Sequence, residues 1–165
     1  MKKIVFVFMV VLLGLGINDA NAQFKVGGGV VYNMKHERMG INFRGSFTMS
    51  EKVDIVTKVD WLFPEIINGN KINVGNVAGD FHYHFRDRDA PLRLYLYPGI
   101  HILRYTPTSG PGNYGNGFLG INLGTGFELS ITEAIDVFGE GKYSFIFQSD
   151  YGGKLVFSIG ALYAL

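Results

Sequence analysis

Two histidines separated by a single residue, His82 and His84, are the residues best spaced for metal chemistry. Alternate side chains of an extended strand point to the same face, so the two imidazoles would lie together. Zinc sites take three or four protein ligands, and Asp80 is the one further candidate donor on that face. We therefore interpret His82 and His84 as a hydrogen-bonded pair, and we predict neither a metal site nor a bound cofactor.

A hydrolytic site would require a nucleophile, a base and an acid within hydrogen-bond reach of one another. Ser144, His101 and Glu140 are the residues that could form such a group, but none of them lies in a recognisable catalytic motif. The glycine run at 27–29 lacks the following helix that a phosphate-binding loop requires, and we interpret it as a tightly packed stretch of strand. The sequence therefore predicts no catalytic residue.

The first 22 residues have the three parts of a secretory signal peptide. A positive start at 1–3 precedes the apolar run Ile4–Ile17, and Ala20-Asn21-Ala22 has the small residues of a cleavage site. The apolar run has 14 residues, fewer than the roughly 20 that a transmembrane helix needs. We expect a signal peptide at 1–22 and a single domain at 23–165.

Charge and cysteine content narrow the classes of function. Loss of the signal peptide would remove Lys2, Lys3 and Asp19, leaving 13 basic residues (15 minus 2) and 13 acidic residues (14 minus 1). A chain without net charge lacks the basic excess that nucleic-acid binding favours, so we predict no nucleic-acid partner. The sequence contains no cysteine, which excludes disulfides and leaves packing and hydrogen bonds as the sources of stability.

The elements that must position these residues are strands, because apolar and polar residues alternate through most of the chain. In the segment 39–49, one face would carry Met39, Ile41, Phe43, Gly45, Phe47 and Met49, and the other Gly40, Asn42, Arg44, Ser46 and Thr48. A period of two residues over such a length is typical of a β-strand. Eight segments show it: 24–32, 39–49, 53–63, 71–85, 92–105, 118–129, 135–147 and 154–165.

Segment lengths and connections indicate how the strands are arranged. Most segments reach the roughly 9–11 residues of a membrane-spanning strand. Longer connections, at 33–38, 64–70, 106–117 and 148–153, alternate with shorter ones, as in outer-membrane barrels. The sequence therefore predicts an all-β fold, an eight-stranded antiparallel up-and-down transmembrane β-barrel.

The fourth segment is the least regular of the eight. Its residues Ile72 and Val74 fall out of step with Val77 and later apolar residues. A β-bulge adds one residue to a strand and reverses which face the following side chains occupy. We expect such a bulge near residues 75–76.

The apolar face of these segments carries almost no charge, whereas the polar face carries balanced charges among small residues. A charge on a lipid-facing position would cost about 2–4 kcal/mol at the bilayer midplane, so its absence indicates contact with lipid. Enclosed charges must be paired. We predict a charge network that fills the lumen, formed by Lys25, Arg44, Asp54, Lys58, Asp60, Arg93, Glu128, Asp136, Glu140 and Lys142.

Aromatic residues gather near the predicted strand ends, as they do at the two interfaces of a membrane. One group comprises Tyr32, Trp61, Phe63, Tyr105, Phe118 and Phe147, and the other Phe24, Phe47, Phe85, Phe127 and Tyr163. We expect both groups to form girdles on the outer surface of the barrel.

The end of the sequence resembles the sorting signal by which outer-membrane barrels engage the barrel-assembly machinery. That signal has a polar residue, a glycine, an aromatic residue and a terminal hydrophobic residue at the spacing of Ser158, Gly160, Tyr163 and Leu165. The usual final phenylalanine is leucine here.

The whole chain after residue 22 resembles the eight-stranded outer-membrane β-barrel domain family, which includes OmpA-type transmembrane domains and small porin-like proteins. The glycine-rich strand, short turn and acidic, tyrosine-containing strand between Gly124 and Phe147 carry the likeness best. The Ala22-Gln23 junction is similar to exported proteins of the Bacteroidetes type. The resemblance implies a location in the outer membrane, with its lipid and the assembly machinery as partners.

Three functions are compatible with these features. A structural or porin-like barrel without catalysis is the leading interpretation, and it would pass little solute because side chains fill an eight-stranded lumen. A lipid-modifying enzyme of the outer membrane is the second. A soluble, lipocalin-like periplasmic barrel that binds a small apolar ligand is the third.

Overall fold

The computed structural model describes residues 24–67, 70–107, 116–148 and 152–165. The predicted signal peptide at 1–22 and the Ala22-Gln23 junction lie outside these residues. Eight antiparallel strands form a closed barrel in the order of the sequence, which confirms the predicted fold class. The strands are β1 (Phe24–Asn33), β2 (Arg38–Ser50), β3 (Val53–Ile67), β4 (Asn70–His84), β5 (Leu92–Pro107), β6 (Asn116–Ser130), β7 (Ile135–Ile146) and β8 (Gly153–Ala164), with a 3-10 turn η1 (Met34–His36) after β1.

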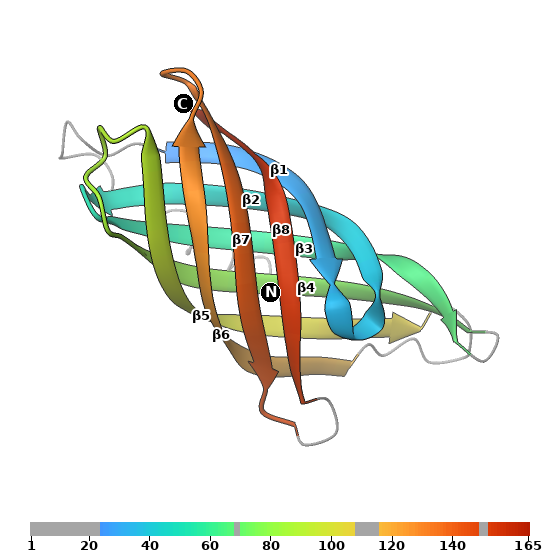
Figure 1. Cartoon of the computed structure of the whole chain (residues 1–165). Coiled ribbons are helices and arrows are strands. Elements are labelled where there is room, and N and C mark those ends of the chain that lie inside the picture. The colour runs from blue at the N-terminus through green and yellow to red at the C-terminus, as the bar shows by residue number, and fades with distance from the viewer. Residues whose placement is uncertain (1–23, 68–69, 108–115, 149–151) are drawn as a thin grey trace, which may run out of the picture.

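Each strand pairs with its neighbour in the chain, and β1 pairs with β8 to close the barrel (Figure 1). On β1, for example, Gly28 lies opposite Phe43 of β2 and Ala161 of β8. Closure leaves no strand edge unpaired, which is what a lipid environment demands of a sheet. Within the described ranges, no helix is both long and apolar enough to cross a membrane.

The two ends of the barrel differ. We call the end that holds Phe24, Leu165 and the connections β2–β3, β4–β5 and β6–β7 the terminal end. The opposite end, with the connections β1–β2, β3–β4, β5–β6 and β7–β8, is the loop end. These names are used below for positions along the lumen.

Strand β3 is longer than the sequence predicts. It continues through Pro64 to Ile67, so most of the connection expected at 64–70 belongs to β3 and β4. The register between β3 and β4 shifts by one residue between Leu62 and Glu65. Proline has no N–H to donate and is tolerated in strands at such bulges, so Pro64 does not end the strand.

The bulge expected near residues 75–76 is absent from β4. Its register with β5 is unbroken from Ile72 opposite Pro107 to His84 opposite Tyr95. Val74, Asn76 and the alternate residues after them all point into the barrel and are buried. The prediction was wrong because it assumed that every apolar residue faces outward, whereas the lumen itself is lined by apolar residues at this end.

These inward-pointing apolar side chains pack together and fill the lumen at the loop end. We call them the apolar layer: Val31, Leu62, Val74, Leu103, Phe118, Ile146 and Val156. Ile72 and Tyr105 pack against them, and the rings of Tyr105 and Phe118 meet edge to face at 5.9 Å. Phe118 and Tyr105, both expected in an outer girdle, therefore face the inside of the barrel.

The outer surface between the two ends is strongly apolar. Exposed outward-pointing residues include Val30, Phe43, Val59, Val77, Phe81, Ile100, Ile102, Leu119, Leu123, Phe145, Phe157 and Ile159. The expected girdle residues Tyr32, Trp61, Phe63, Phe147, Phe24, Phe85, Phe127 and Tyr163 are also exposed, whereas Phe47 and Tyr105 are half-buried. This distribution is the inverse of a water-soluble barrel, in which apolar side chains gather inside.

Candidate functional site in the barrel lumen

All ten residues of the predicted charge network point into the barrel, and each is at most 6% exposed. The structure also places Arg38, Asp80 and Lys154 inside, which the predicted network did not include. Arg38 lies just before the predicted segment 39–49, so a longer reading of the same period would have found it. Lys154 begins the predicted segment 154–165, and the alternation of that segment already placed it on the inward face. Most of these charges, other than Arg38 and Lys154, form a central cluster and a second cluster near the terminal end.

Glu140 of β7 is the centre of the central cluster. Arg44 of β2 binds it through two parallel contacts, Nη1 to Oε1 at 2.7 Å and Nη2 to Oε2 at 3.0 Å. Lys58 of β3 donates to both oxygens from Nζ, at 3.0 and 2.8 Å, and the Tyr95 hydroxyl donates to Oε1 at 2.8 Å. A buried carboxylate with this many donors is well compensated.

Aromatic rings enclose this cluster. The Arg44 guanidinium lies 3.4 Å from the centre of the Phe138 ring, and Lys58 Nζ lies 4.1 Å from that of Tyr97. His82 stacks on Tyr95 and Tyr97, with ring centres 4.5 and 4.6 Å apart. Ring faces attract cations, and the rings also exclude water from the ion pairs.

The sequence makes room for these rings by placing glycine opposite them. Tyr95 faces Gly126 and Tyr97 faces Gly124 on β6. A Cβ added to either glycine would collide with the facing ring. Small residues opposite large ones are a common way to fill a narrow barrel.

Asp60 extends the network toward the loop end. It accepts hydrogen bonds from Asn42 and Asn76, and Lys142 Nζ approaches it at 3.3 Å. Asn42 in turn accepts from Arg44 Nε at 3.1 Å. Lys58 bridges Glu140 and Asp80, at 2.8 and 2.9 Å, so these charges form one connected network across the lumen.

The second cluster lies near the terminal end. Lys25 Nζ contacts Asp136 at 2.6 Å and Glu128 at 2.8 Å. Arg93 Nη1 lies 3.4 Å from Glu128 and 3.8 Å from Asp54. The six residues that pair within this cluster, His84 included, come from six strands, β1, β3, β4, β5, β6 and β7, so the cluster holds the barrel wall together across its interior.

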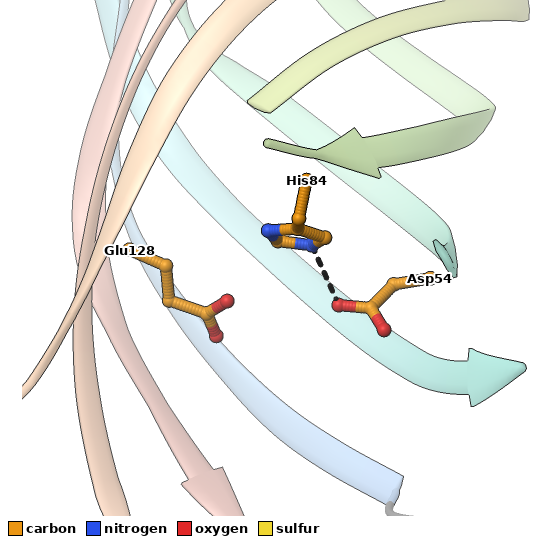
Figure 2. A group of neighbouring side chains, drawn as sticks. All are labelled: Asp54, His84 and Glu128. Carbon is orange, nitrogen blue, oxygen red and sulfur yellow. Dashed lines mark hydrogen bonds and ion pairs between the residues drawn. The ribbon is translucent and has the colours of Figure 1, made fainter. Parts of the chain in front are cut away.

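Three residues of this second cluster have side chains of the types that bind metal ions and lie close together (Figure 2). Asp54, His84 and Glu128 are the group of possible ligands found in the described chain, with donor atoms within 4.8 Å of one another. His84 Nε2 contacts Asp54 Oδ2 at 2.9 Å, and Glu128 approaches from the other side. Because Arg93 and Lys25 already neutralise these carboxylates, we interpret the group as part of the ion-pair cluster rather than as a metal centre.

The two histidines do not form the hydrogen-bonded pair expected from the sequence. Their ring centres are 6.4 Å apart, and each ring has its own partners: carboxylate Asp54 for His84 and the tyrosines for His82. Side chains two residues apart on a strand share a face but stand too far apart for direct bonding in this geometry.

The three candidate catalytic residues are not assembled into a hydrolytic site. The Ser144 hydroxyl donates to Asn122 Oδ1 at 2.8 Å, and Glu140 is bound by Arg44 and Lys58. Among the hydrogen bonds of the described residues, none joins Ser144 to His101 or Glu140. The arrangement offers no activated nucleophile.

The residues of the C-terminal sorting-type pattern occupy both faces of β8 and its end. Ser158 points inward and donates to Glu140 at 3.3 Å, and Gly160 lies inward against Phe138. Tyr163 and Leu165 are exposed, and the Leu165 amide donates to Phe24 O at 3.0 Å. The outer half of the pattern is therefore accessible on the barrel surface.

No family model and no curated protein matches the chain. Several solved structures are similar to it. The N-terminal β-barrel domain of OprF from Pseudomonas aeruginosa is 14% identical over 88% of this chain and 98% of its own, with a TM-score of 0.68. A major outer membrane protein from Thermus thermophilus is 13% identical over 87% and 99%, with a TM-score of 0.64. Neisserial surface protein A (NspA) is 12% identical over 86% and 93%, with a TM-score of 0.62. The chain thus has the fold of eight-stranded outer-membrane β-barrels.

Proposed function

We propose that this protein is a structural, non-catalytic barrel of the bacterial outer membrane whose lumen is closed to solutes. The observation that carries the proposal is the filling of the lumen. The Glu140 cluster with its aromatic rings occupies the middle, and the apolar layer occupies the loop end.

The apolar outer surface supports a position in lipid. Exposed residues such as Phe43, Ile100 and Leu123 would each lose water contact in a bilayer, and the buried charges would stay paired inside. A soluble lipocalin-like barrel requires an apolar interior that holds its ligand. Here most of the buried residues are polar or charged, and ion pairs occupy the middle and the terminal end of the interior, which argues against that alternative.

Small cavities inside the barrel support a lumen that is closed to solutes. Two cavities inside the described barrel have volumes of about 20 and 10 Å³. Either has room for about one water molecule. The larger hollow, of about 530 Å³, is lined mainly by apolar residues such as Phe127 and Phe157, whose side chains are on the outer surface.

Planar-bilayer recording tests closure directly. The purified protein should insert without producing a large, stable conductance, while an open porin in the same bilayer should give one. A large, stable and reproducible conductance from the pure protein would overturn the proposal, because it would require a continuous water-filled path through the lumen.

Membrane location and assembly are tested separately. The protein should fractionate with outer membranes, and Tyr163→Ala combined with deletion of Leu165 should reduce the folded amount in that fraction, because the sorting-type pattern loses both exposed residues. The exposed Phe85→Ala variant is a matched control for the loss of a surface aromatic residue. Recovery of the wild-type protein in the soluble periplasm would contradict the outer-membrane location.

A further inference from the structure

A small internal cavity lies where the lumen lining changes from charged to apolar. Its volume is about 20 Å³, above the roughly 10–15 Å³ that one water molecule needs. Val31, Leu62, Leu103 and Val156 of the apolar layer line one part, and the polar lining consists of Asn33, Asp60, Asn76, Lys142, Ser144 and Lys154. The cavity has room for one water-sized molecule or ion.

Lys154 is the exception among the lysines of the lumen. Lys25, Lys58 and Lys142 each contact at least one carboxylate. Lys154 also points inward and is only 6% exposed, yet no carboxylate of the described chain lies within 4.0 Å of its Nζ. Burial of an ammonium group without a counter-charge is strongly unfavourable.

The charges that line the cavity do not balance. Lys142 and Lys154 contribute two positive charges, and Asp60 contributes one negative charge. The Asp60 carboxylate is already occupied by Lys142 and by the amides of Asn42 and Asn76. One positive charge beside the cavity is therefore left without compensation by the side chains that line it.

We propose that this cavity binds a small monovalent anion of the size of chloride, held between the ammonium groups of Lys142 and Lys154. An anion supplies the missing negative charge, which a water molecule in the same space cannot do. Phosphate or a carboxylic acid is too large for a volume close to that of one water molecule. Lysine stems are flexible, so small movements of the two Nζ atoms can adapt the cavity to an ion slightly larger than water.

Thermal unfolding in different sodium salts tests the proposal. Protein extracted from outer membranes into detergent would be compared in chloride, bromide and gluconate at equal ionic strength, since gluconate is too large for the cavity. Chloride and bromide should raise the midpoint by about 2–5 °C in a saturable way, as expected for a ligand that binds only the folded state. Lys154→Met should abolish this difference and should be more stable than the wild type in gluconate, because the unpaired charge is gone.

Lys71→Met, at an exposed position of β4 away from the cavity, is the matched control and should keep the chloride effect. Crystals grown in bromide give a second measurement that does not depend on any variant, and an anomalous peak is expected between Lys142 Nζ and Lys154 Nζ. The proposal fails if the wild type shows no saturable chloride effect, if Lys154→Met retains it, or if the bromide peak is missing and a water molecule fills the cavity.

Discussion

The middle of the lumen and its loop end are closed in two different ways. In the middle, Glu140 is held by Arg44, Lys58 and Tyr95 through charged hydrogen bonds. At the loop end, the apolar layer closes the same tube with side chains such as Leu103 and Phe118 that form no ion pairs. Closure of the middle depends on the pairing of opposite charges, whereas closure of the loop end depends on apolar side chains that exclude water.

This difference shows what a narrow barrel requires of its interior. The lumen is too small to be filled by water alone, so side chains must fill it, and any that carry charge must pair. Lipid contacts the outer surface of the barrel, so apolar residues in the lumen do not further favour insertion of the barrel into the membrane. The lumen can therefore be filled either by paired charges or by apolar side chains. The two regions should nevertheless respond differently to substitution.

The largest effect is expected from Glu140→Gln in the central cluster. The change leaves Arg44 and Lys58 buried with only part of their counter-charge, and we expect a loss of about 3–5 kcal/mol in the free energy of unfolding. Urea unfolding in lipid vesicles measures it. Glu133→Gln, in the exposed β6–β7 turn, is the matched control and should change little. A loss below about 1 kcal/mol for Glu140→Gln, the size typical of exposed pairs, would mean that water already reaches the cluster.

Leu103→Ala should break the apolar layer with a somewhat smaller effect. Leu103 is fully buried among the other residues of the layer, so truncation leaves a cavity and should cost about 3 kcal/mol. Leu123→Ala removes the same atoms from an exposed, outward position of β6 and should cost much less. Equal losses for the two variants, measured by the same unfolding experiment, would show that the apolar layer is not tightly packed.

Gly124→Ala tests how closely the aromatic rings fill the middle of the lumen. The added methyl group would collide with the Tyr97 ring, and overpacking of this kind typically costs about 1–3 kcal/mol. Gly79→Ala, on β4, adds the same group where nothing lies within 4 Å, so it should be nearly neutral. The unfolding midpoints of the two variants should therefore separate clearly, and identical midpoints would count against a filled lumen.

The smallest effect is expected at the exposed pair of Lys52 and Asp87, which are 3.3 Å apart at the terminal end. Both side chains are in contact with solvent, so Lys52→Met should cost about 0–1 kcal/mol and the cost should fall with added salt. Lys25→Met removes a lysine of the same kind from a buried cluster and should cost several times more, with little dependence on salt. The comparison separates the effect of enclosure from that of charge itself.

The sequence predicted the strands well and their interior less well. The period of two residues located all eight strands and assigned the inward face of residues such as Arg44 and Glu140, because side chains on a strand alternate strictly. The same rule failed at Val74. Val74 is an apolar residue on the inner face, and its apolar character predicted an outward position and a shift in the alternation. Phe118 and Tyr105 were assigned to the outer surface for the same reason, and both pack inside the barrel.

Individual contacts could not be predicted from the periodicity. Arg44 and Glu140 are 96 residues apart in the sequence, and Lys25 and Asp136 are 111 apart. Which charges meet depends on the register between all strands and on the closure of β1 against β8. Neither the register nor the closure can be predicted from the alternation within a single segment.

The sequence by itself determined an eight-stranded barrel with an apolar outside and a charged inside, because alternation acts along each strand and needs no knowledge of its neighbours. Only the tertiary structure decided how the lumen is closed. It brought Glu140 to Arg44 and Lys58, gathered the apolar layer at one end, and placed Lys154 beside a small cavity, where no carboxylate of the described residues pairs with it. These features arise where strands that are distant in the sequence face one another across the lumen. The distances between their side chains depend on the pairing of β1 with β8, which closes the barrel.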